Sequence, residues 1–482
     1  MSSNKKEHSF DFTGLKRVIA LGLSKSKGLF LLVVFIAVFS ACFAVYRPYL
    51  TGNIIDNYIL NKDLPGLKFE IIKLIVILFF EGLLSFFTVY LANVVAQRVI
   101  KVLRVKLYNH LIKFKLGYFD KTPNGVLVTR SVSDVETIAE LLVWENLVNT
   151  YGNIPYSEAF KALEKNYTPK YDDAKTIYID LLDRLDAAIA KIDVSNKGYS
   201  TGGDFVFNGD MRRWKKTANA IKLRLGINLA DVDPVLSKTV VESAYASGLY
   251  GSNDEDYTFN FDTGTFTNPF YDNFVASGRN DFIPSELVIN TMKSKTDPRL
   301  DKWFTKVNGE FKGGEFGTTN TFANFSHVGN FFLSKDGPVD LISFTEISFI
   351  LAEAAARGFN VGGTAESYYK QGIEASFSES NISGLELDTY LANNLYDSSN
   401  WKKSIGEQAY IALFTRGYAA WNFTRRLDYP ILVNPDRSFI DGVPVRMPYS
   451  DQEYVLNKNN VDAAAAAIGG DEATTRLFWD IK

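Results

Sequence analysis

The chain has 482 residues and a formal net charge of −3, but the charge is divided unevenly along it. Residues 1–140 hold 18 Lys and Arg against 10 Asp and Glu, whereas the remainder holds 34 against 45. This length exceeds what one hydrophobic core usually supports, so we expect two or more domains. A single cysteine excludes an intrachain disulfide and a Cys-rich zinc site. The acidic larger part disfavours nucleic-acid binding.

Two apolar runs near the start of the chain predict a transmembrane hairpin. The first, Gly28–Tyr46, contains no charged residue and is long enough to cross a hydrocarbon layer about 30 Å thick. The second, Ile71–Ala96, contains Lys73 and Glu81. A charge inside a span usually faces other helices or water, so Glu81 predicts a bundle with further partners. Buried core helices are the alternative for both runs.

Basic residues are concentrated before the first run and after the second. The loop between the runs holds only three basic residues, Arg47, Lys62 and Lys68. Because cytoplasmic flanks carry the excess of Lys and Arg, both ends of the hairpin are expected in the cytoplasm.

Two segments beside these runs carry a family resemblance. Arg47–Leu60 reads RPYLTGNIIDNYIL, and Gly117–Leu141 reads GYFDKTPNGVLVTRSVSDVETIAEL. They resemble the first two membrane helices and first intracellular loop of a type I ABC exporter, whose FFD-x-TP-x-G pattern corresponds to Tyr118–Gly125. The resemblance implies a partial exporter transmembrane segment over residues 1–141. The G-x-x-x-x-G-K-[ST] phosphate-binding motif is absent from the sequence, so we expect no ATP hydrolysis.

The cysteine allows an alternative interpretation of the first run. Phe39-Ser40-Ala41-Cys42 has the small-small-Cys ending of a bacterial lipoprotein signal. However, the basic leader is longer than such signals normally have, and the apolar residues Phe43–Tyr46 follow the cysteine. We therefore interpret Cys42 as a small apolar residue within a helix, with lipidation as the alternative.

The rest of the chain shows amphipathic helical patterns separated by polar loops. In Tyr171–Ile192, apolar residues recur at four-residue steps. Two Gly- and Asn-rich stretches, Tyr250–Asn280 and Val307–Phe332, predict long loops with a few short strands. The fold class is therefore mostly α, an α-solenoid-like scaffold that displays a surface. Further helices are predicted over Trp214–Leu229, Phe344–Arg357, Thr364–Phe377 and Ile405–Thr424.

Six ordered segments of this part resemble the SusD/RagB family, especially its SusD-like branch, over about 146–482. They are Leu147–Phe160 (LVNTYGNIPYSEAF), Asp204–Pro234, Asp297–Leu300, Glu346–Ser376, Ile405–Arg426 and Val443–Asp480. The resemblance implies a tetratricopeptide-like, non-enzymatic, cofactor-free lipoprotein of the outer membrane. Such a protein captures glycans or peptides for a TonB-dependent transporter. The family's own export signal and first helices are not matched, since the exporter-like hairpin stands in their place.

Candidate ligand-binding residues lie mainly in the loop Thr267–Phe282. Glycan binding needs exposed aromatic rings for stacking and planar polar groups for hydroxyls, and functional residues are often found in loops. The alternative is that the loop's aromatic residues pin it to the scaffold. Trp214, Trp421, Arg425 and Arg426 fall on helical patterns and are interpreted as structural. The candidates are Asn268, Phe270, Tyr271, Phe274, Arg279, Asp281, Trp303 and Trp401.

Catalytic and metal-binding interpretations of other motifs are weaker. Gly198–Gly202 matches G-x-S-x-G, but Ser200 sits in a polar loop after a helix rather than on a strand-to-helix turn. Asp254-Glu255-Asp256 lacks the D-x-D-x-DG loop that wraps calcium. We expect no enzyme activity and no metal site. The hairpin implies the inner membrane and the SusD-like part the outer membrane, so we hypothesise that the sequence is composite.

Overall fold

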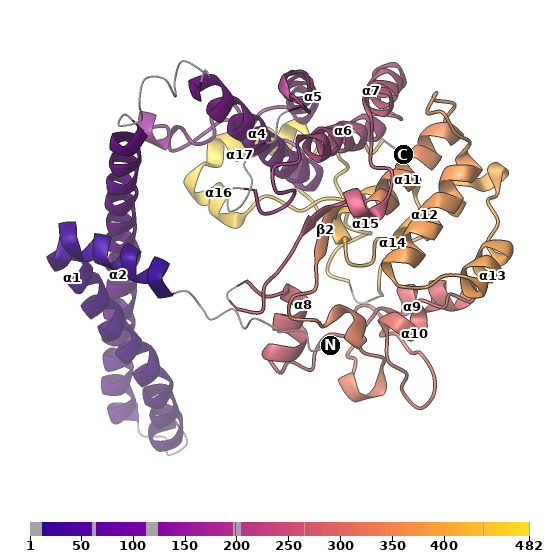
Figure 1. The fold of residues 1–482 in the computed structure, drawn as a ribbon. Coiled ribbons are helices and arrows are strands. Elements are labelled where there is room, and N and C mark those ends of the chain that lie inside the picture. Colours follow the sequence, from indigo (N-terminus) through magenta and orange to yellow (C-terminus); the bar gives the residue numbers. More distant parts are fainter. Residues whose placement is uncertain are drawn as a thin grey trace, which may run out of the picture. The chain divides into compact units, whose positions relative to one another are not determined.

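The computed structural model describes residues 12–59, 64–111, 124–195, 198, 204–264, 266–436 and 438–481. The chain divides into two compact units, Met1–Asn124 and Gly125–Lys482. Figure 1 shows both, with helices as the dominant element.

The first unit is a hairpin of two long helices that pack against each other. Helix α1 spans Phe12–Ile54 and is followed by a π-helical turn, Ile55–Ile59; helix α2 spans Leu64–Leu111. Two stretches, Leu31–Ile54 and Gly66–Thr88, are long and apolar enough to cross a membrane. The apolar-helix prediction is thus confirmed.

Glu81 has a partner within the hairpin. Its carboxylate lies 3.8 Å from Nε of Arg47 on the other helix. The presence of further helices around Glu81 stays a prediction, and within the hairpin the positively charged Arg47 lies close to its carboxylate.

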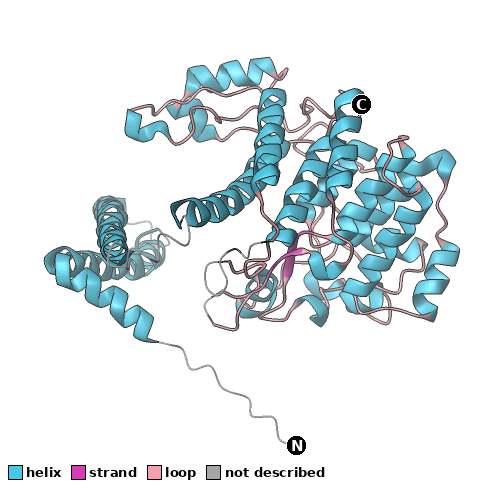
Figure 2. Ribbon diagram, turned by 45° about the horizontal axis from the view of Figure 1, so that its top comes forward, coloured by secondary structure: helices cyan, strands magenta, loops and turns pink. Residues whose placement is uncertain are grey.

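The second unit is built from packed helices with long loops, which confirms the predicted fold class. Consecutive helices pack as pairs, namely α6 with α7, α11 with α12 and α14 with α15, and α11, α12 and α14 lie side by side (Figure 1). Figure 2 shows the same predominance of helices over strands. The helices are α4 Asn124–Tyr151, α5 Ala174–Lys191, α6 Met211–Asn228, α7 Pro234–Ser247, α8 Pro269–Tyr271, α9 Glu286–Ser294, α10 Leu300–Trp303, α11 Phe344–Ala356, α12 Ala365–Glu379, α13 Leu385–Asn393, α14 Trp401–Ala412, α15 Gly417–Leu427, α16 Asp451–Leu456 and α17 Lys458–Ala467.

Local sequence explains where these helices begin. The side chains of Asp173, Asp210 and Ser343 accept hydrogen bonds from the first-turn amides of α5, α6 and α11. Thr364 and Ser367 form a reciprocal capping box at the start of α12. Each cap satisfies backbone N–H groups that have no partner inside the helix.

The prediction of one helix over Ile405–Thr424 is wrong, because the helix is interrupted at residues 413–416, between α14 and α15. The break turns Phe414 onto the rings of Trp303 and Phe304, at centroid distances of 5.7 and 5.2 Å. It also directs Arg416 to two carboxylates on other elements. These tertiary contacts override the helical periodicity.

One short sheet joins two loops. Strand β1, Tyr257–Phe259, pairs antiparallel with β2, Val339–Ile342. Strand β2 lies outside both of the predicted loop stretches, directly before α11.

Among the described residues, the largest hydrophobic core extends from α4 to Trp479 near the end of the chain, beside two smaller clusters. Ile138 and Leu141 of α4 are fully buried with Leu181 of α5, Ile221 of α6 and Phe349 of α11. Helix α4 is continuous through the stretch where the exporter-like and SusD-like resemblances meet. Ile138 and Leu141, which belong to the exporter-like segment, therefore form part of the core of the second unit.

Candidate functional site

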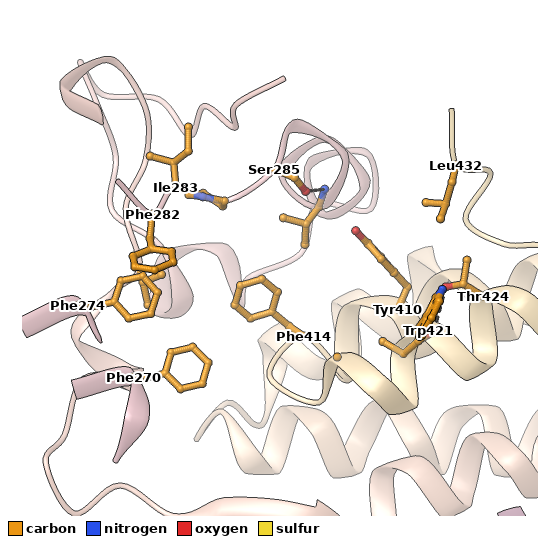
Figure 3. Close-up of a pocket in the computed structure, with 15 residues that line it drawn as sticks. Phe270, Phe274, Phe282, Ile283, Ser285, Tyr410, Phe414, Trp421, Thr424 and Leu432 are labelled. Atoms are coloured by element: carbon orange, nitrogen blue, oxygen red, sulfur yellow. Dashed lines mark hydrogen bonds between the residues drawn. The ribbon is translucent and has the colours of Figure 1, made fainter. Parts of the chain in front are cut away.

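The second unit holds a cavity of about 370 Å³ whose walls are rich in aromatic rings. Figure 3 shows Phe270, Phe274 and Phe282 on one side and Tyr410 and Trp421 on the other. The remaining lining residues are Ile283, Pro284, Ser285, Val288, Val328, Phe414, Gly417, Ala420, Thr424 and Leu432. Loop 267–284 and the ends of α14 and α15 thus meet here.

Hydrogen bonds fix the loop that carries the phenylalanines. The Asn268 side chain accepts from the backbone N–H of Phe270 (2.7 Å) and donates to the carbonyl of Gly337 (2.8 Å). The Asn268 backbone N–H donates to the carbonyl of Lys335 (2.9 Å). Because Asn268 is buried, its role in the structure is to anchor α8.

The phenylalanine rings support one another. Phe270 stacks on Phe274 with ring centroids 5.7 Å apart, and Phe274 lies 4.8 Å from Phe282. Phe270 also stacks on Phe332 at 6.0 Å. Such offset contacts are favourable for aromatic pairs. They hold a set of ring faces at the cavity wall.

Polar groups of the cavity wall are engaged inside the protein. Ser285 Oγ accepts from the Val288 N–H at the start of α9 (3.3 Å), and Thr424 Oγ1 donates to the Ala420 carbonyl (3.0 Å). The Trp421 indole N–H donates to the Pro444 carbonyl (3.3 Å). Burial raises the pKa of Tyr410, so its hydroxyl is neutral at physiological pH.

No ionisable group other than Tyr410 is present among the described residues that line the cavity. The cavity therefore offers ring faces and apolar surface rather than a general acid and base.

The structure brings only two of the predicted ligand residues to this cavity. Phe270 and Phe274 line it, whereas Tyr271 lies beside Lys335, with the ammonium 5.9 Å from the ring. Arg279 and Asp281 form an exposed ion pair, with Nε 3.0 Å from Oδ1. The Arg279 guanidinium also covers Phe282 at 4.6 Å.

The two predicted tryptophans lie elsewhere. Trp303 is buried and its indole N–H donates to Ser380 Oγ (3.1 Å). Trp401 is half-buried, and the Arg357 guanidinium lies 5.4 Å from its ring. Both rings are therefore occupied by protein contacts.

Four aromatic residues of the cavity, Phe282, Tyr410, Phe414 and Trp421, are not among the ligand-binding candidates predicted from the sequence. Tyr410, Phe414 and Trp421 fall on the helical pattern Ile405–Thr424, where apolar residues are normally interpreted as core. The structural role predicted for Trp421 stays a prediction: its ring lines the cavity and also carries the Arg425 guanidinium, 3.9 Å from the ring centroid. These rings meet at the cavity because the helix is interrupted before α15, and the helical periodicity does not predict that interruption.

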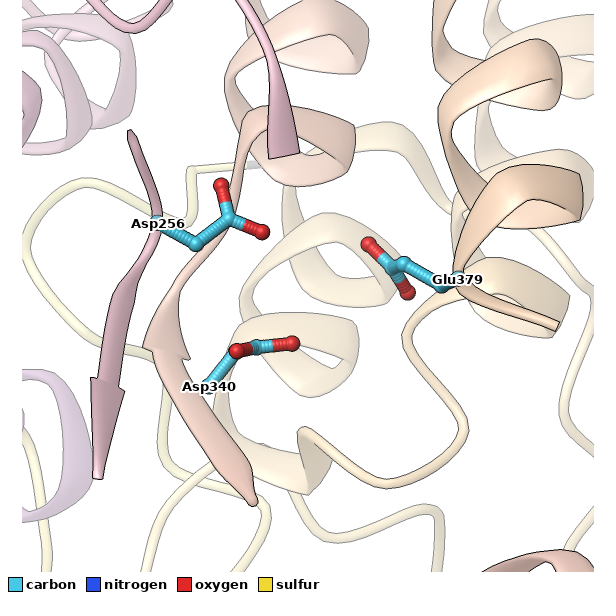
Figure 4. Close-up of side chains that lie close together, drawn as sticks. All are labelled: Asp256, Asp340 and Glu379. Carbon is cyan, nitrogen blue, oxygen red and sulfur yellow. The ribbon is translucent and has the colours of Figure 1, made fainter. Parts of the chain in front are cut away.

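A second cluster contains three carboxylates, Asp256, Asp340 and Glu379 (Figure 4). Arg416 forms ion pairs with two of them, with Nη1 3.0 Å from Asp340 and Nη2 2.8 Å from Glu379. Burial, with the nearby charge of Asp340, raises the pKa of Asp256 to about 8, which favours its neutral form. The guanidinium occupies the cationic position, so the cluster ties β1 and β2 to α12.

The neighbouring acidic stretch is likewise engaged. Glu255 pairs with Lys216 at 2.6 Å, and the carbonyl of Asp254 accepts from Arg213 (2.6 Å). Ser200 of the G-x-S-x-G match lies outside the described residues.

Comparison with known families identifies the second unit. A SusD-like family model, described as starch-binding and associating with the outer membrane, matches residues 119–450. The chain therefore belongs to this family.

Solved structures agree with this assignment. A chitin-binding protein has 27% identity and a TM-score of 0.67, over 74% of this chain and 82% of that protein. A chitin-binding SusD homologue from Flavobacterium johnsoniae has 27% identity and a TM-score of 0.65, over 72% and 80%. A SusD homologue from Bacteroides uniformis has the same identity and TM-score, over 72% and 81%.

The exporter resemblance is confirmed for the first part of the chain. A model of the ABC transporter transmembrane region matches residues 30–148. The ABC transporter ATP-binding protein YfiC of Bacillus subtilis is 30% identical over 140 residues, and a lipid A-core flippase of Syntrophus aciditrophicus is 32% identical over 90 residues. The chain spans 23% and 15% of the length of these two relatives.

Proposed function

We propose that the unit Gly125–Lys482 captures a glycan at the outer membrane and delivers it to a TonB-dependent transporter. The observation that carries this proposal is the aromatic cavity, whose wall contains the rings of Phe270 and Phe274 on a loop anchored by Asn268. Sugar rings have apolar faces that stack on aromatic side chains. Family membership and the chitin-binding relatives support a glycan over a peptide.

The runner-up function is that of an exporter transmembrane fragment, supported by the match over residues 30–148. It accounts for the hairpin but leaves the larger unit unexplained. We assign residues 1–141 to this segment and 146–482 to nutrient binding. The two parts imply different membranes, which supports a composite origin. Long sequencing reads across codons 130–155 of native DNA test it, since uninterrupted coverage contradicts an assembly error.

Calorimetric titration of the full chain in detergent with the N-acetylglucosamine hexamer and with maltohexaose, a glucose hexamer, tests glycan capture. We expect Phe274→Ala to weaken binding roughly tenfold, because a stacking face is lost. Phe205→Ala is the control, since Phe205 is 79% exposed and does not line the cavity. Binding of peptides alone, or equal affinity of Phe274→Ala and wild type, would contradict the proposal.

A further inference from the structure

A larger groove of about 700 Å³ adjoins the aromatic cavity. Tyr410 and Leu432 line both spaces, and Figure 3 shows them on the same side of the aromatic cavity. The groove extends from there along α9, past the turn at residues 315–317, to residues 431–436. A chain-like ligand seated in the cavity therefore has a continuation available in the groove.

The groove has apolar walls that are open to solvent. Phe316, Ile431 and Val433 are 59%, 67% and 80% exposed, although each is a large apolar side chain. Gathered exposed apolar residues mark binding surfaces more often than scattered ones do. The exposed apolar walls of the groove are therefore suited to contact with the apolar faces of a ligand.

The charged side chains among the described residues that line the groove are all acidic. Glu286, Glu315 and Asp436 line it, and no Lys, Arg or His is present among its described lining residues. Glu286 Oε1 accepts a hydrogen bond from the Asn290 side-chain amide (3.0 Å). In the part of the chain that the structure describes, Glu286 and Glu315 form no ion pair. We base the inference on Glu286 and Glu315 and not on Asp436, because the basic residue next to Asp436 in the sequence, Arg437, lies outside the described residues.

We propose that this groove is a second subsite of the same glycan site and selects sugar units that carry a free amino group. The inference rests on the proposed function. A protonated amine gains attraction from Glu286 and Glu315, whereas a uronic acid placed there meets like charges. The hydroxyl groups and apolar faces of an amino sugar fit Asn290 and the exposed walls.

Three soluble oligosaccharides of equal length test the selectivity on the full chain in detergent. They are the glucosamine hexamer, the N-acetylglucosamine hexamer and the galacturonate hexamer, titrated at mildly acidic pH so that the amines are protonated. We expect the glucosamine hexamer to bind about fivefold tighter than the acetylated one, and the acidic one to bind weakest. The preference should shrink as salt is added, because the carboxylates are exposed to screening.

The double variant Glu286→Gln/Glu315→Gln should bind the glucosamine hexamer and the N-acetylglucosamine hexamer with equal affinity. Glu386→Gln, an exposed glutamate on α13, is the matched control and should keep the preference. Phe274→Ala should weaken both hexamers by the same factor, since it acts in the shared cavity. Equal binding of the two hexamers by wild type, or a preference retained in the double variant, would overturn the subsite. Absence of binding to all glycans would overturn the proposed function as well.

Discussion

The two units contain helices of similar residue types but place their apolar side chains in opposite surroundings. In the hairpin, Phe35 and Phe79 are 66% and 65% exposed. In the second unit, Ile138, Leu181 and Phe349 are completely buried. The hairpin helices satisfy their backbone groups internally, and their exposed apolar surface is of the kind that suits a lipid environment. The helices of the second unit instead bury their apolar faces against one another.

Helix α4 is the element in which the two family matches overlap. The exporter model ends at residue 148 and the SusD-like model begins at residue 119, so both include most of this helix. Its residues Ile138 and Leu141 pack in the core of the second unit. Residues 124–148 of this helix are common to both family matches.

The largest expected effect comes from the buried charges that connect α4 to this core. Arg224 lies between Glu145 and Glu346, with its Nε 3.4 and 3.0 Å from their carboxylates. Arg224→Met leaves two buried carboxylates without their cation, so we expect a loss of about 3–5 kcal/mol in the free energy of unfolding. Denaturant titration of the full chain in detergent, followed by tryptophan fluorescence, measures it.

All six tryptophans lie in Gly125–Lys482, so the fluorescence reports on that unit alone. Arg212→Met on the same helix is the control, because Arg212 is exposed. Equal stability of the Arg224 and Arg212 variants would show that the triad contributes nothing to the core.

A somewhat smaller effect tests whether α4 belongs to the core at all. Leu141 is fully buried, and truncating such a side chain costs about 2–5 kcal/mol through lost transfer energy and the cavity that remains. We therefore expect Leu141→Ala to lower the unfolding midpoint strongly. Val143→Ala, at a position on the same helix that is 57% exposed, should leave the midpoint unchanged. Similar midpoints for the two variants would place α4 outside the cooperative unit.

The pH dependence of stability provides a third test. Burial, reinforced by Glu346 and opposed by Arg224, raises the pKa of Glu145 to about 7 from an ordinary value of 4.5. The folded state thus keeps a proton that the unfolded state releases. This contribution is complete below about pH 4.5 and is lost as the pH rises through about 7, a change of roughly 3 kcal/mol.

Glu145→Gln cannot ionise, so its free energy of unfolding should fall less steeply between pH 5 and pH 8 than that of wild type. Some decline should remain, because burial also raises the pKa of Asp256, to about 8. Unfolding curves at several pH values measure both slopes, and parallel slopes would contradict the assignment to Glu145.

The sequence predicts elements whose stability is local and fails where distant contacts decide. The pattern Tyr171–Ile192 corresponds to α5 because its apolar stripe and its Asp173 cap lie within the segment. The break after Ala412 depends on Arg416 meeting Asp340 and Glu379, which are 76 and 37 residues away. No periodicity within the segment contains that information.

The same limit applies to the candidate site. Phe270 and Phe274 are recognisable because they stand in a polar loop, where large aromatic residues need an explanation. In the sequence, Tyr410 and Phe414 have the spacing of ordinary core residues. In the structure, where the helix ends at Ala412, both line the cavity. Trp303 was proposed for its ring, but a partner 77 residues away, Ser380, satisfies its indole inside the core.

The smallest expected effect separates ligand binding from loop anchoring in the same region. Arg279 is exposed, and its partners are Asp281, two residues away, and the ring of Phe282. Because exposed ion pairs contribute little, Arg279→Gln should leave the unfolding midpoint of the second unit unchanged. A glycan affinity that falls while the midpoint is constant would support Arg279 as a ligand contact. A midpoint that falls instead would favour the alternative that this loop's side chains pin it to the scaffold, since a residue that only touches ligand adds nothing to the stability of the unliganded protein.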